Sequence, residues 1–116
     1  MDSADAEEEN TVDYKPNAFK ATLILPIQDN AGAPFPVEAW EWWRDEETQV
    51  LKGFTELGIV KGFWRGQLER NKMISVVVKH ENNLDELRQL LHEARAVFKQ
   101  EAMYFDCHPV YLEEVR

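Results

Sequence analysis

Glu47 is the residue whose type and position most directly suggest chemistry. On a helix that begins near Pro36, Glu47 falls between Trp43 and Leu51, at the centre of an apolar stripe. A carboxylate in an apolar stripe is costly unless it is paired, and burial raises its pKa. Two interpretations stay open: a proton-handling carboxylate in a cleft, or one half of a structural ion pair.

Glu101 follows Gln100 where the second expected helix gives way to the last main strand. In a structural role, these two side chains satisfy backbone groups at that junction. Alternatively, Glu101 joins Glu47 and Arg65 in a polar pocket, which would bind a cationic or hydroxylated ligand or perform acid–base work. No residue is assigned a catalytic role, and the lack of a recognisable catalytic arrangement favours a protein that is not an enzyme.

Other chemistry finds little support in the residues. His80, His92 and His108 lack the spacing of metal ligands, and Cys107 points to the opposite face of its strand from His108. Phosphate-binding and dinucleotide-binding glycine motifs are absent from the sequence. We therefore expect neither a metal nor a cofactor. A single cysteine, with no secretory signal or apolar span, favours a cytoplasmic protein without membrane contact.

A second group of residues suggests contact with a partner or an anionic ligand. These candidate binding residues are Trp42, Lys61, Trp64, Arg65, Arg70 and Lys72. Most lie in a basic hairpin that could grip an acidic partner, or that could simply be solvated. Trp42 lies on the polar side of its helix, where an exposed indole would mark a contact surface. The alternative is an indole that lies over neighbouring loop residues.

The charge is unevenly distributed along the chain. Its formal net charge is -9 over 116 residues, and residues 1–13 contain acids but no base. We expect 1–17 to be an acidic, disordered leader and 18–116 to be a single domain. The domain is acidic in its first helix and basic in its hairpin. This balance argues against binding to duplex nucleic acid, which requires phosphate neutralisation.

The elements that would position these side chains follow from hydrophobic periodicity. Strands are expected at 19–26, 59–68, 72–80, 103–107 and 110–112, and helices at 36–52 and 83–101. The hairpin turn is placed at 68–71, and Asn83 with Glu86 suggests a capping box. The order β-α-β-β-α-β predicts an α+β, ferredoxin-like sandwich, with an antiparallel sheet covered on one face by two helices. Pro109 separates the last two segments and leaves room for an extra C-terminal edge strand.

The order of several short motifs resembles a small bacterial domain family of unknown function. The motifs are Gly-x-Thr and Gly-x-Trp-Arg within 53–66, a Val-rich strand at 75–80, and Phe-x-Gln-Glu-Ala within 97–105. They follow a helix that carries Trp and Glu, and the resemblance covers about residues 20–105. It implies the ferredoxin-like fold, and the family has no assigned chemistry to transfer.

Two functions are compatible with these features. The first is a small binding or regulatory module that acts through protein–protein contact, as a homodimer or with another protein, such as a bacterial or phage accessory protein. The alternative is a small enzyme or ligand-binding protein that uses the pocket of Glu47, Arg65 and Glu101.

Overall fold

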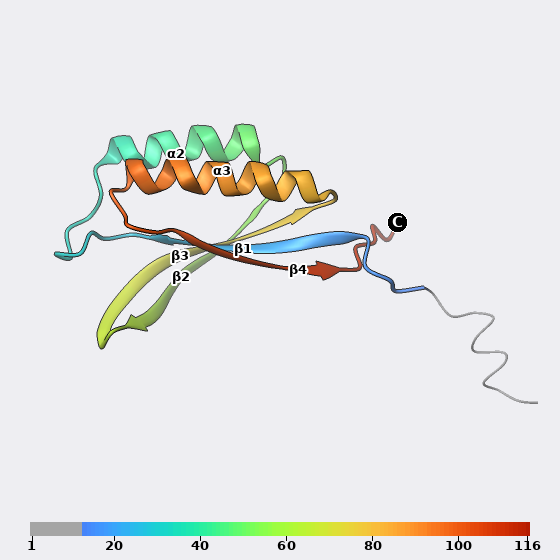
Figure 1. The fold of residues 1–116 in the computed structure, drawn as a ribbon, viewed down its shortest axis with the longest axis horizontal. Helices are drawn as coiled ribbons and strands as arrows, with labels where there is room; N and C mark the ends of the chain where they lie inside the picture. Colours follow the sequence, from blue (N-terminus) through green and yellow to red (C-terminus); the bar gives the residue numbers. More distant parts are fainter. Residues whose placement is uncertain (1–12) are drawn as a thin grey trace, which may run out of the picture.

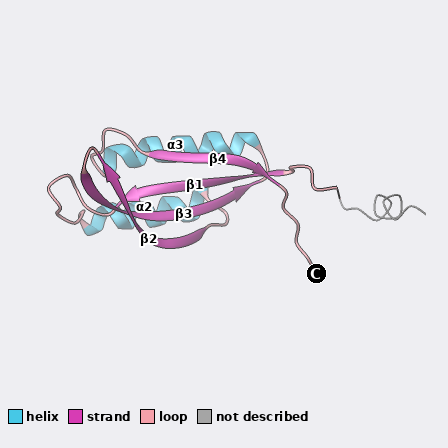
Figure 2. Ribbon diagram, turned by 90° about the horizontal axis from the view of Figure 1, so that it is seen from below, coloured by secondary structure: helices cyan, strands magenta, loops and turns pink. Residues whose placement is uncertain are grey.

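The computed structural model of the protein describes residues 13–116. Within them the elements are β1 (Ala18–Pro26), α2 (Val37–Val50), β2 (Thr55–Trp64), β3 (Gln67–Val78), α3 (Glu81–Val97) and β4 (Tyr104–Val110). The strands form one antiparallel sheet in the order β2-β3-β1-β4. Both helices cover the same face of that sheet (Figures 1 and 2). This is the ferredoxin-like α+β sandwich that the sequence predicts.

The core lies between the sheet and the two helices. Alternation along β1 points Ala21, Leu23 and Leu25 toward the helices, and all three are fully buried. The apolar stripe of α3 meets them, with Leu87, Leu90, Leu91 and Ala94 buried. Because one stripe of each helix packs on the same face of the sheet, the helices leave the opposite face uncovered.

The β2–β3 hairpin turns four residues earlier than the sequence suggests. Arg65 and Gly66 are its two central residues, with φ of 50° and 79°. Successive positive φ values define the tight turn whose twist matches that of paired strands, and glycine adopts them at little cost. The expected turn at 68–71 is therefore wrong, since those residues continue the ladder of β3.

Both ends of α3 also differ from expectation. The helix begins at Glu81, and its N-cap residue, His80, makes no side-chain cap bond. Asn83, expected as the cap, lies within the helix and donates its backbone N–H to the carbonyl of His80. The helix ends at Val97, before Lys99 takes a left-handed conformation with φ of 51°. The capping-box prediction was therefore wrong, as was the extension of the helix to residue 101.

β4 is one continuous strand and not two. Pro109 lies inside it, opposite Phe19 of β1. A proline is tolerated there because β4 is an edge strand, where one backbone side needs no partner. Residues 111–116 form no strand, so the extra C-terminal edge strand is not found.

Part of the predicted leader contacts the folded domain. The Asn17 side chain exchanges two hydrogen bonds with the backbone of Leu112, and the rings of Tyr14 and Tyr111 meet edge to face. The remainder of the predicted leader, residues 1–12, lies outside the described residues. Neither α2 nor α3 has the length and apolar character needed to cross a bilayer.

Candidate functional site

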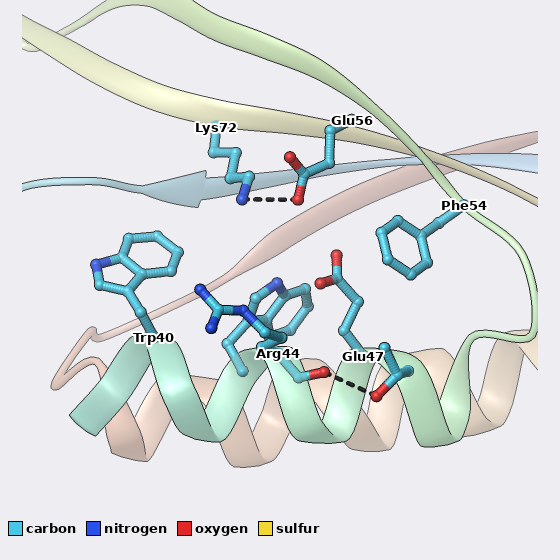
Figure 3. A pocket seen from close by; sticks show the side chains of 8 residues that line it. Trp40, Arg44, Glu47, Phe54, Glu56 and Lys72 are labelled. Atoms are coloured by element: carbon cyan, nitrogen blue, oxygen red, sulfur yellow. Dashed lines mark hydrogen bonds and ion pairs between the residues drawn. The ribbon is translucent and has the colours of Figure 1, made fainter. Parts of the chain in front are cut away.

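A cavity of about 490 Å³ lies between α2 and the β2–β3 side of the sheet. Its walls are Trp40, Trp43, Arg44, Glu47 and Thr48 of α2, together with Phe54, Glu56 and Lys72 (Figure 3). The α2 residues reach it because positions three and four apart share one side of a helix. Glu56 and Lys72 reach it because their positions on adjacent strands face the helices.

Glu47 is buried in this cavity without a hydrogen-bond partner. Glu47 is only 3% exposed. Neither its Oε1 nor the buried indole Nε1 of Trp43 makes a hydrogen bond. Burial raises the pKa of Glu47 above its ordinary value, and the nearby Glu56 carboxylate raises it further. Lys72 and the Trp43 indole, which lies near without hydrogen-bond geometry, oppose this rise. The carboxyl group can therefore hold a proton or accept a hydrogen bond.

Lys72 is the cation that lowers the pKa of Glu47 most, but its ammonium group is already paired with Glu56. Its Nζ lies 2.8 Å from Oε1 of Glu56 and 5.7 Å from the ring centroid of Trp40. Figure 3 shows this ion pair across the cavity from the Glu47 carboxyl group. Glu47 consequently lies in the field of Lys72 without a direct salt bridge to it.

The three residues of the predicted polar pocket are not brought together. Glu47 lines the cavity described above, whereas Arg65 lies at the hairpin turn with its guanidinium 5.6 Å from the Trp64 ring centroid. Glu101 lines a different hollow of about 290 Å³ beside α3 and β4, where its carbonyl accepts a hydrogen bond from Arg95. The side chain of Gln100 donates to the backbone of Phe98, which is the structural role considered for this junction.

The predicted binding residues separate into three environments. Lys61, Trp64 and Arg70 are exposed on the hairpin. Lys72 is half-buried inside the cavity and is not part of that exposed surface. Trp42, expected to be an exposed indole, is also half-buried and packs against the core.

The sequence analysis did not assign Arg44, Thr48, Glu56 or Lys72 to a pocket with Glu47, although signals for three of them were present. Lys72 alternates with Ile74 and Val76, so period two places it on the same buried face. Arg44 and Thr48 flank Glu47 at helical spacing. Glu56 lacked such a signal, because its partner on β3 depends on a register shift between Glu56 and Gly58.

No protein-family model matches the chain, and no curated protein matches it in sequence. Among solved structures, a phage SAM lyase in complex with S-methyl-5′-thioadenosine is similar, with a TM-score of 0.56, 16% identity, and coverage of 88% of each chain. A DUF3240 family protein from Shewanella baltica has a TM-score of 0.55 and 16% identity, covering 86% of this chain and 97% of its own. At these identities the likeness shows the fold, a small α+β domain of the ferredoxin-like class.

Proposed function

We propose that the protein binds a small molecule with a flat, hydrogen-bonding ring, an adenine nucleoside, in the Glu47 cavity. One observation carries the proposal: Glu47 Oε1 and Trp43 Nε1 are buried without a hydrogen-bond partner, and both residues line the cavity. Buried polar groups normally have partners, so a ligand that bridges them would remove a cost of about 1–3 kcal/mol per group. The edge of adenine presents an N–H donor beside a ring-nitrogen acceptor, which complements this pair.

The size and walls of the cavity support the same ligand class. Its volume of about 490 Å³ is ordinary for a small-molecule site. Trp40 and Phe54 line it and offer aromatic surface on which a flat ring can stack. Arg44 and Lys72 add polar groups that suit the hydroxyls of a sugar.

The likeness to the phage SAM lyase guides the choice of probes. That protein was solved with S-methyl-5′-thioadenosine, a neutral adenine nucleoside. S-adenosylmethionine shares its adenosine part and adds a cationic sulfonium centre. Comparing the two probes separates a carboxylate that accepts a hydrogen bond from one that acts as a counter-ion, because only the latter favours the cation.

Isothermal titration calorimetry of the full chain with each probe tests this function. We expect saturable binding that Glu47→Gln weakens about tenfold, the loss of one charge-assisted hydrogen bond. Glu86→Gln, an exposed change on α3, serves as the matched control and should leave the affinity unchanged. Chromatography of the recovered probe shows whether it is returned intact or converted. Absence of binding, or equal affinity of wild type and Glu47→Gln, would refute the proposal.

As a second candidate, we propose that the protein acts through contact with another copy of itself. The observation that favours it is the exposure of large apolar side chains along one hairpin, namely Leu57, Ile59, Phe63, Trp64 and Leu68. Soluble monomers rarely leave such a group uncovered. Light scattering coupled to size exclusion tests it: a mass above that of the 13.6 kDa chain supports self-association, and a monomer rejects it.

A further inference from the structure

The β2–β3 hairpin has one face that mixes apolar and basic side chains. In the strand register, Ile59 lies opposite Lys72, Lys61 opposite Arg70, and Phe63 opposite Leu68. Directly opposed residues share a face, and alternate rows stay on it. Because Lys72 lines the cavity under α2, the two rows beyond it continue the helix side of the sheet toward the hairpin tip.

Nothing in the described chain covers this face. Figure 1 shows the hairpin tip curling away from the helix layer, and Ile59, Phe63 and Leu68 are 57%, 77% and 50% exposed. Lys61 and Arg70 face each other directly, which is a destabilising arrangement of like charges. Among residues 13–116 no carboxylate forms a salt bridge with either of them. The face therefore lacks both an apolar cover and an acidic partner.

The outer face of α2 has the complementary charge. Glu38, Glu41 and Asp45 are exposed, and their helical spacing places them in one stripe on the side away from the core. None of them forms a salt bridge within the described residues. Val37, also exposed at the start of the helix, adds an apolar contact beside the stripe.

We infer that the helix-side face of the hairpin in one copy of this chain packs on the acidic outer face of α2 in a second copy. The inference rests on the second candidate function, self-association, and names the two surfaces that meet. The acidic stripe would relieve the repulsion between Lys61 and Arg70, while Phe63 and Leu68 would leave water. Since each copy carries both surfaces, two copies related by a twofold axis can form the contact twice.

Paired charge reversals test the pairing of the surfaces. Lys61→Glu with Arg70→Glu, and separately Glu41→Lys with Asp45→Lys, should each raise the dissociation constant of self-association about tenfold. Combining all four changes should restore the wild-type constant, because the charges are then exchanged. Lys79→Glu with Lys99→Glu alters net charge as much as the first pair but lies outside both surfaces, and should have no effect.

Sedimentation velocity of the full chains at low salt provides the measurement. Weakening by both pairs and recovery in the fourfold variant support the inference. If the charge reversals leave the dissociation constant unchanged, the proposed pairing of surfaces is wrong, while self-association itself is retained. A wild-type chain that stays monomeric to about 100 µM overturns both, since any dimer would then be too weak to matter.

Discussion

The Glu47 carboxyl group is buried beside an ion pair in which it takes no part. In that pair, Lys72 Nζ lies 2.8 Å from Glu56 Oε1. Lys72 thus forms a salt bridge with Glu56 and acts on Glu47 only through its charge. The cavity therefore holds a titratable group whose charged form is poorly compensated, and this arrangement makes both its stability and its ligand binding sensitive to pH.

Replacing Glu47 with Gln should stabilise the protein at pH 8. Burial raises the pKa of the folded-state carboxyl group above its ordinary value of 4.5. Its stabilising contribution is fully present below that value and is lost as the pH rises through the raised pKa. We expect wild-type stability to fall across that window and the variant to fall less. At pH 8 the variant should gain about 1 kcal/mol, or about 4 °C in Tm. Thermal denaturation from pH 4 to 8 measures this, and a variant less stable than wild type at pH 8 would contradict it.

Replacing Lys72 with Met should destabilise the protein at pH 8 by about 1 kcal/mol. The change removes the ion pair to Glu56 and the contact of the ammonium with Trp40. It also removes the cation that most favours the charged form of Glu47. In the double variant with Glu47→Gln, the loss should be smaller, since the uncompensated carboxylate is gone. Urea unfolding of the four proteins in this cycle measures the coupling; strictly additive free energies would exclude it.

Two adjacent substitutions at the hairpin turn should act in opposite directions. Gly66 has a φ of 79°, so Gly66→Ala should cost about 1 kcal/mol. Arg65 has a φ of 50°, a conformation that asparagine tolerates better than arginine, so Arg65→Asn should add about 0.5 kcal/mol. Gly53→Ala is the control, since a Cβ there meets open space and its φ is not positive. Equal effects of the two glycine changes would argue against the turn geometry described above.

Alanine substitutions of two phenylalanines should have different effects, one on folding stability and the other on self-association. Phe98 is fully buried, and its ring meets Phe35 and Trp40 edge to face. Phe98→Ala should therefore cost about 3–4 kcal/mol of folding free energy. Phe63 is 77% exposed, and Phe63→Ala should cost under about 0.5 kcal/mol while weakening self-association. Chemical denaturation and sedimentation, run on both variants, check the contrast. A large folding loss in Phe63→Ala would place its ring in the core.

Much of the fold could be predicted because its signals are local. The stripe of α3 and the alternation of β1 each repeat with the period of their element, and the order of elements leaves few ways to bury them. The burial of Glu47 followed from the same logic, since its neighbours along the stripe, Trp43 and Leu51, are buried too. The predictions that were wrong concern the ends of elements. The turn at Arg65 and the cap of α3 depend on backbone angles that hydrophobic periodicity does not encode.

By itself, the sequence determined the ferredoxin-like sandwich and the presence of one carboxylate in its apolar layer, because both depend on spacing along single elements. Only the tertiary structure decided which side chains lie around that carboxylate. Arg65 and Glu101, which one alternative placed beside Glu47, do not line its cavity, while Glu56 and Lys72 do. Which strand position lies under which helix turn depends on register and on a bulge in β2. Pairing between distant segments sets both of these, and side-chain periodicity does not record it.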